Sequence, residues 1–182
     1  MPKENYAAVA ICYNEEIDMA AFLTVNSRYV SQIVIVDDGS TDGTEKVVKD
    51  FIERNKDVEV LFIKKKRKPN EYFSDQRNYG ISMTTKDFIF HLDIDEFISE
   101  ELFNECCKAE LSGYDAVKYK RRNHFLGVPM FYGNWSSWHR THFARANLIM
   151  FGDRMHESII YDYDGKVYVT DAYTLHLNES CY

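Results

Sequence analysis

The chain has 182 residues, a length that fits one domain with a sizeable core. Hydrophobic residues make up 45% of it and aromatic residues 15%, a composition that excludes an intrinsically disordered chain. The formal net charge of −7 argues against general binding to nucleic acid or to an acidic membrane.

Hydropathy and cysteine spacing indicate a soluble, cytoplasmic protein. No apolar stretch reaches the roughly 18 residues of a membrane span, and the polar segment 1–6 is not a signal peptide. Four cysteines lack the spacing of a disulfide framework or of a zinc site: Cys12, Cys106, Cys107 and Cys181. We expect all of them to be reduced thiols.

Four short apolar runs near the N-terminus predict buried strands. They cover residues 7–12, 33–36, 58–63 and 87–92. Continuous hydrophobicity of this kind is typical of strands that are buried on both faces of a parallel sheet. We therefore expect these four strands to form the centre of the fold.

Helical periodicity predicts three helices between the strands. The first should begin after an N-cap at Asn14, and its apolar stripe consists of Ile17, Ala20, Ala21, Thr24 and Val25. The second should be opened by Asp42 and Glu45 in capping-box spacing, and its stripe consists of Val47, Val48, Phe51 and Ile52. The third covers residues 72–83.

Strands that alternate with helices predict an α/β fold with a mainly parallel central sheet flanked by helices. Ligands of such sheets bind at the carboxyl ends of the strands, which here are the turns after Cys12, Val36 and Leu92. These three turns are the first places in which to look for functional residues.

The second half of the chain has a different pattern. The runs 114–120, 141–145 and 166–170 predict strands of a small mixed β region. No repeat or low-complexity linker interrupts the chain, so we expect a single domain over residues 1–182. We expect the first half, about residues 1–100, to bind the donor of a group-transfer reaction, and the second half, about residues 101–182, to bind the acceptor.

Two aspartates, Asp93 and Asp95, directly follow the fourth strand. In an extended chain, side chains two residues apart point to the same side. Such a pair can bridge Mg²⁺ or Mn²⁺ to a diphosphate, where the metal neutralises the charge on a departing nucleoside diphosphate. The alternative is a plain turn whose acidic residues precede a helix capped at Ser99.

The segment 36–44, which contains Asp37 and Asp38, begins at the end of the second strand. A carboxylate at such a strand end can accept a hydrogen bond from a ribose hydroxyl or a base N–H. The glycines of this segment allow the backbone to turn tightly. The alternative is a turn that caps the next helix.

Four blocks of the sequence resemble family 2 glycosyltransferases with the GT-A fold. They are Cys12-Tyr13-Asn14-Glu15-Glu16, residues 33–44, Asp75-Gln76-Arg77-Asn78-Tyr79-Gly80 and Asp93-Ile94-Asp95-Glu96. The blocks occur in the family's order and with suitable spacing. The later segment Arg154-Met155-His156-Glu157-Ser158 is similar to the "HE" segment of lipopolysaccharide-core members.

Two features depart from the family pattern. Cys12 replaces the commoner proline before the Tyr-Asn pair. The chain is also shorter than most members, so we expect its acceptor half to be reduced or to be completed by a partner chain. The length suggests a minimal version, of the kind that a viral or prophage-like genome would encode.

The resemblance implies a binding site for a nucleotide-sugar donor. Tyr13 and Glu15 would lie beside the base, and Asp38 would contact the base or the ribose. Arg77 would approach the base or the diphosphate, and Asp93 would hold the ribose and metal region.

The resemblance also implies a metal site for Mn²⁺ or Mg²⁺. Asp95 would coordinate the ion directly, next to Asp93. A late histidine completes the metal shell in many GT-A enzymes, and His176 is the candidate here. The alternative for His176 is a half-buried strand residue with an ordinary hydrogen bond.

Family 2 members are typically inverting, which implies a general base for the acceptor hydroxyl. The candidates are Glu157, which matches the "HE" segment, and Asp153. His156 could orient either one. The alternative is a helix cap or a salt link with Arg154.

Two other stretches have open interpretations. The basic run 64–68 is either a solvated loop or a lip that attracts the anionic donor or an acidic acceptor surface. The aromatic stretch 131–138 either stacks on an acceptor sugar, packs in the core or forms a homodimer contact.

The sequence therefore predicts an enzyme, a hexosyltransferase that uses a UDP- or GDP-sugar and a glycan, glycoprotein or glycolipid acceptor. One alternative is a sugar nucleotidyltransferase, but this would need a glycine-rich phosphate loop that residues 12–15 do not provide. The other is a catalytically silent module that binds nucleotide-sugars or serves in assembly.

Overall fold

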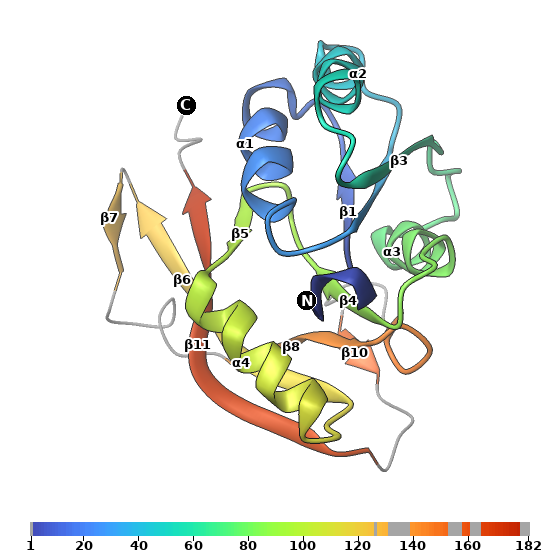
Figure 1. The fold of residues 1–182 in the computed structure, drawn as a ribbon. Helices are drawn as coiled ribbons and strands as arrows, with labels where there is room; N and C mark the ends of the chain where they lie inside the picture. Colours follow the sequence, from blue (N-terminus) through green and yellow to red (C-terminus); the bar gives the residue numbers. More distant parts are fainter. Residues whose placement is uncertain (1, 126, 131–138, 153–157, 161–164, 179–182) are drawn as a thin grey trace.

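The computed structural model of the chain describes residues 2–125, 127–130, 139–152, 158–160 and 165–178 (Figure 1). Within these ranges, none of the helices combines the length and the apolar character that crossing a membrane requires. The described cysteines, Cys12, Cys106 and Cys107, are free thiols, as expected.

Four parallel strands form one part of a nine-stranded sheet. They lie in the order β3-β2-β1-β4, and their bounds are β1 (Tyr6–Cys12), β2 (Gln32–Asp37), β3 (Glu59–Lys64) and β4 (Phe88–His91). Each coincides with a predicted apolar run. β1, β2 and β4 are buried on both faces, as predicted. β3 is only partly buried, because it is the edge strand.

Helices cover both faces of this sheet (Figure 1). Their bounds are α1 (Glu16–Asn26), α2 (Thr44–Arg54), α3 (Phe73–Ser82) and α4 (Glu100–Leu111), and a short 3₁₀ helix η1 (Pro2–Asn5) precedes β1. One core cluster contains Phe22 of α1, Val48 of α2 and Leu102 of α4. The second contains Ile81 of α3, so α3 packs on the opposite face.

The C-terminal half continues the same sheet beyond β4. The additional strands are β8 (His139–Arg145), β6 (Ala116–Phe125), β11 (Val167–Asn178) and β5 (Glu96–Ile98), with β7 (Val128–Pro129) paired to β6. β8 and β5 run antiparallel to their neighbours, whereas β6 and β11 are parallel to each other. A separate hairpin consists of β9 (Met150–Gly152) and β10 (Ser158–Ile160). The predicted α/β fold, mainly parallel with a mixed β region, is confirmed.

The sheet curls so that its β5 edge returns to α1. Only four residues separate β4 from β5, yet β5 pairs with β11 at the far edge of the sheet. The side chain of Asn26 on α1 fixes this return, because it donates to the Glu96 carbonyl at 3.1 Å and accepts from the Ile98 N–H at 3.0 Å. The turn that carries Asp93 and Asp95 is therefore anchored at both ends.

Asn26→Ala should lower the free energy of unfolding by about 2–4 kcal/mol. Asn26 is fully buried, and its loss leaves two backbone groups of β5 without partners, each at a cost of roughly 1–3 kcal/mol. Urea unfolding measures the change. Thr24→Ala, at an exposed position of the same helix, is the control. A loss as small as that of the control would contradict this role for Asn26.

The apolar face predicted for α1 is wrong. The buried residues of this helix are Met19, Phe22, Leu23 and Asn26, whereas Ile17 of the predicted stripe is 78% exposed. The larger side chains of the competing stripe bury more apolar area, and burial energy scales with that area. The helix exists as expected, but it is rotated.

Two predicted helix caps are also wrong. Glu15, not Asn14, precedes α1, and Asn14 has a positive φ of 55°. Before α2, Gly43 takes the cap position without a side-chain bond, so no capping box forms between Asp42 and Glu45. Asp42 accepts instead from the Thr44 N–H at 3.0 Å. By contrast, Ser99, the cap named in the alternative interpretation of the aspartate turn, does cap α4, accepting from the Leu102 N–H at 3.1 Å.

Candidate active site

One cavity of about 380 Å³ opens at the carboxyl ends of β1, β2 and β4. Its walls include every residue that the sequence suggested for donor or metal binding: Tyr13, Glu15, Asp38, Arg77, Asp93, Asp95 and His176. These residues come from three strand-end turns, from α3 and from β11. The fold thus brings together positions that are up to 163 residues apart in the sequence, from Tyr13 to His176.

The turns after β1 and β2 are bonded to each other at the cavity. The Asn14 N–H donates to Ser40 Oγ at 2.9 Å, and the Thr41 N–H donates to Asn14 Oδ1 at 2.8 Å. Gly39 has a φ of 92°, a left-handed conformation that favours glycine. Asp37 accepts from the Ser40 N–H at 3.1 Å. This network holds the start of the Tyr13–Glu15 segment against the Asp38 turn.

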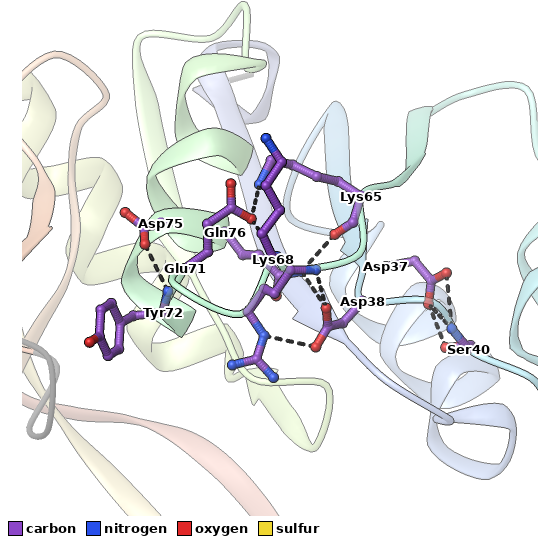
Figure 2. Close-up of polar contacts among 10 residues, drawn as sticks. Asp37, Asp38, Ser40, Lys65, Lys68, Glu71, Tyr72, Asp75 and Gln76 are labelled. Carbon is purple, nitrogen blue, oxygen red and sulfur yellow. Dashed lines mark hydrogen bonds and ion pairs between the residues drawn. The ribbon is translucent and has the colours of Figure 1, made fainter.

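Asp38 is held by donors from two sides. Its Oδ1 accepts from the Arg67 N–H at 2.7 Å and from Gln76 Nε2 at 3.0 Å, and its Oδ2 accepts from Arg67 Nε at 2.8 Å. Figure 2 shows that Gln76 lies beside Asp38 and Lys65. Gln76 Nε2 also donates to the Lys65 carbonyl at 2.7 Å. Burial acts to raise the pKa of Asp38, but the bonds from Arg67 outweigh it and lower the pKa.

The basic run 64–68 is largely engaged in ion pairs. Lys64 pairs with Glu45, Lys65 lies 3.3 Å from Glu71, and Arg67 pairs with Asp38. The guanidinium of Arg67 also lies over the ring of Phe73, 3.7 Å from its centroid. These contacts make Arg67 a support for the cavity wall, a role that no sequence pattern indicated.

Asp93 and Asp95 lie in a turn and not in an extended segment, so the expected strand alternation does not apply. The Glu96 N–H closes the turn by donating to the Asp93 carbonyl at 3.0 Å. Both aspartates nevertheless face the cavity. The turn forms because β5 must begin at Glu96 to pair with β11.

Asp93 is bound by arginines from both halves of the chain. Arg77 donates to Asp93 Oδ1 through both terminal nitrogens at 3.1 Å, and Arg121 Nη1 lies 3.8 Å from Oδ2. Burial acts to raise the pKa of Asp93, but the charge of Arg77 outweighs it, and the pKa is lowered. Arg121 also donates to Glu96 Oε1 at 3.1 Å, and Glu96 is buried.

Asp95 lies against His176. The β5–β11 register places His176 opposite Glu96, and the Leu177 N–H donates to the Asp95 carbonyl at 3.0 Å. Nε2 of His176 is 2.9 Å from Oδ2 of Asp95, whereas its Nδ1 is buried with no hydrogen-bond partner among the described residues. His176 and Asp95 are thus fixed as one pair by strand pairing.

The described donors are too few, on their own, for a divalent cation site. Within the described ranges, no three His, Cys, Asp or Glu side chains are already clustered as a complete metal site. The Asp95–His176 pair and Asp93 offer carboxylate oxygens and an imidazole nitrogen at one cavity wall. Such a site would need further ligands from a bound diphosphate, which is the usual arrangement for Mg²⁺.

Burial raises the pKa of Glu15 to about 7, with further contributions from Asp18 and Asp95. The native state therefore holds the Glu15 proton more tightly than the unfolded chain, whose carboxyl has an ordinary pKa. Stability should fall as the pH rises from about 4.5 to about 7, because ionisation opposes folding. Glu15 therefore gives the cavity a carboxyl group whose pKa lies near neutrality.

Glu15→Gln should remove this pH dependence. Between pH 5 and pH 8, the free energy of unfolding of the native chain should fall by about 2 kcal/mol more than that of the variant, a figure discounted for partial solvent exposure. Urea unfolding in metal-free buffer measures both curves. Parallel pH profiles would show that Glu15 ionises in its ordinary range.

Three residues with roles at the site were assigned no role from the sequence, although Asn78 lies within a block that resembles the family. His91 is fully buried, within 3.4 Å of Arg77 Nη1, and burial followed by the charge of Arg77 lowers its pKa well below the ordinary value. Asn78 clamps β9, because it donates to the Phe151 carbonyl and accepts from the Phe151 N–H, both at 2.8 Å. Arg121 is the third.

The candidate bases Asp153 and Glu157, together with His156 and the aromatic stretch 131–138, lie outside the described residues. Asn78 fixes the backbone at Phe151, two residues before Asp153 in the sequence. Both base candidates remain predictions.

Comparison with known sequences supplies the family. The model of "Glycosyl transferase family 2" matches residues 8–160, which include all the sequence blocks described above. The lipopolysaccharide core biosynthesis glycosyltransferase LpsC of Rhizobium meliloti (strain 1021) is 27% identical over 130 residues, which are 70% of this chain and 46% of that protein. The chain spans less than half the length of the curated relatives that it matches.

Solved structures show the same fold. TarS 1–349 of S. aureus, in complex with UDP-GlcNAc, gives a TM-score of 0.71 at 16% identity, over 98% of this chain and 60% of that chain. The mannosyltransferase PcManGT of Pyrobaculum calidifontis, in complex with GDP-Man and Mn²⁺, gives 0.56 at 19% identity, over 65% of this chain and 36% of that chain. The fold is GT-A. The match over residues 8–160, in the block order that the sequence displays, shows that the chain belongs to glycosyl transferase family 2.

Proposed function

We propose that this chain is an inverting glycosyltransferase that moves a hexose from a UDP- or GDP-sugar to a hydroxyl of a glycan or glycoconjugate. The main observation in support is that all seven residues expected to bind the donor or the metal line one cavity. Its volume of about 380 Å³ is within the range of small-molecule sites. TarS was solved with UDP-GlcNAc and PcManGT with GDP-Man, which supports a nucleotide-sugar as the ligand class.

The charge of the cavity supports a requirement for Mn²⁺ or Mg²⁺. Its walls carry two basic side chains, Arg77 and His176, against five carboxyl groups: Glu15, Asp18, Asp38, Asp93 and Asp95. A diphosphate would be repelled by such walls unless a cation lay between them. A bound metal would neutralise the charge that develops on the departing nucleoside diphosphate. Asp93, Asp95 and His176 are the residues that would hold it.

The other cavity residues would bind and orient the donor. Tyr13, which is 55% exposed, offers a flat ring for the base. Asp38 keeps acceptor capacity after its three bonds to Arg67 and Gln76, because a carboxylate has about four acceptor sites. Arg77 fixes the orientation of Asp93, which sets the direction of the aspartate turn.

Transfer with inversion needs a base that takes the proton from the acceptor hydroxyl as it attacks the sugar. Glu157 is our first candidate and Asp153 the second. The Asn78 clamp on Phe151 supports a defined position for the chain just before both residues. We assign the acceptor to the C-terminal half, about residues 101–182.

Thermal unfolding with UDP, GDP, CDP and dTDP, each with and without Mn²⁺, tests the proposal. A nucleotide at about 100 times its Kd should add about 2.7 kcal/mol to the stability of the folded chain. We expect one of the nucleotides to stabilise the protein in this way, and only with Mn²⁺. If none of the eight conditions shifted the transition, the cavity would not be a donor site.

A further inference from the structure

A group of three arginines surrounds the buried end of the aspartate turn. Arg77, Arg121 and Arg140 come from α3, β6 and β8, and their charges act on Asp93 and Glu96. Arg77 and Arg121 have carboxylate partners within hydrogen-bond distance, at Asp93 and Glu96. Arg140 is different: among the residues that the structure describes, it donates no side-chain hydrogen bond and forms no ion pair within 4.0 Å.

Arg140 is held on the same side of the sheet as Arg121. The β6–β8 register places Arg140 opposite Tyr119, which is buried, and Arg121 is two residues farther along β6 on the same face. Arg121 in turn lies 3.1 Å from Glu96 and 3.8 Å from Asp93. The fold therefore directs the two guanidinium groups to one region beside the aspartate turn.

This region has an excess of positive charge. Burial, and then the neighbouring charge of Arg121, hold the pKa of Arg140 below its ordinary value. Three arginines thus act on two carboxyl groups, Asp93 and Glu96. Burial also lowers the pKa of nearby His142 to about 4, so this side chain is neutral at pH 7. A half-buried cation with a second cation as its neighbour is most simply stabilised by an anion.

That anion is not the donor diphosphate. Neither Arg121 nor Arg140 is among the described residues that line the donor cavity. Asp93 separates the two places, because its Oδ1 faces Arg77 of the donor half and its Oδ2 faces Arg121 of the second half. Both arginines belong to strands of the half that we assign to the acceptor.

We propose that Arg140 and Arg121 form a second anion site, next to the donor cavity, for a phosphate or carboxylate group carried by the acceptor. A guanidinium binds either group with two parallel hydrogen bonds, which fixes the orientation of the ligand as well as its charge. The acceptor would then be an acidic sugar or glycan, held close to Asp93 with its hydroxyl toward the donor. This inference rests on the proposed function.

The test compares glucose 6-phosphate, glucuronate and glucose as probes, at matched ionic strength. Binding to the full chain is measured by NMR titration, both alone and with the stabilising nucleotide and Mn²⁺ at saturation, so that the donor cavity is filled. We expect at least one acidic probe to bind roughly ten-fold more tightly than glucose, since a hydrogen bond between two charged groups is stronger than one to a neutral hydroxyl. The two acidic probes distinguish a phosphate site from a carboxylate site.

Arg140→Gln should reduce the affinity for the acidic probe to that for glucose, and Arg140→Lys should retain part of it. Arg28→Gln, at an exposed position elsewhere, should change nothing. Nucleotide binding should be unaffected in all variants, which shows that they are folded. Equal affinity for acidic and neutral probes, or unchanged acidic binding in Arg140→Gln, would overturn the inference. Failure of every nucleotide to bind would instead contradict the proposed donor site.

Discussion

Asp95→Asn should abolish metal-dependent donor turnover and the metal-dependent part of nucleotide stabilisation. The substitution keeps the shape of the side chain but removes the charge of Asp95, which lies beside His176 and would face the proposed cation. Since a bound metal contributes several kcal/mol of charge stabilisation in the transition state, we expect turnover to fall by roughly a hundred-fold or more. Donor hydrolysis or transfer at several Mn²⁺ concentrations gives the turnover, and thermal unfolding gives the nucleotide affinity.

The matched control is Asp50→Asn, which removes a carboxylate from the exposed surface of α2, where Asp50 pairs with Lys46. This variant should keep full activity. Asp95→Asn should also unfold close to the temperature of the native chain in the absence of nucleotide and metal, because the amide can still bond to His176. Full metal-dependent activity in Asp95→Asn would show that the cation is held elsewhere.

The strand ends of the N-terminal half could be predicted from the sequence for a physical reason. Strands buried on both faces read as continuous apolar runs, and polar residues that follow such runs must lie at one edge of a parallel sheet. The turns after Val36 and Leu92 could therefore be placed at a common site from local patterns, whereas the choice of Asp38 rested on the family resemblance. For Arg77, which lies on a helix, the family resemblance supplied the expectation.

Contacts that depend on long-range pairing could not be predicted in this way. β5 has three residues, and nothing in Glu96-Phe97-Ile98 indicates that its partner is β11. The Asp95–His176 contact depends on that pairing, so only the resemblance suggested it. Arg121 and Arg140 lie just outside the predicted strands 114–120 and 141–145, and their partial burial results from the curl of the sheet.

The buried face of α1 was predicted wrongly for a different reason. Two stripes compete in this helix, and both satisfy helical spacing. The sequence contains the information that decides between them, since Phe22 and Leu23 bury more area than Ala20 and Ala21. Weighting the stripes by side-chain size would have selected the correct face.

Glu157→Gln should retain donor binding and lose transfer. If Glu157 accepts the proton of the acceptor hydroxyl, the amide cannot do so, and the rate should fall by roughly a hundred-fold to ten-thousand-fold. We assign the metal and the nucleotide to other residues, so nucleotide stabilisation with Mn²⁺ should equal that of the native chain. Single-turnover transfer separates this loss from any change in acceptor binding.

Asp153→Asn is the matched variant, because it removes the other carboxylate of the same segment with an equally small change in shape. We expect it to keep most of the transfer activity. The opposite result, with transfer lost only in Asp153→Asn, would move the base to Asp153, which follows closely after the Asn78 clamp on Phe151. Full transfer in both variants would mean that neither carboxylate is the base, and the acceptor proton would then leave by another route.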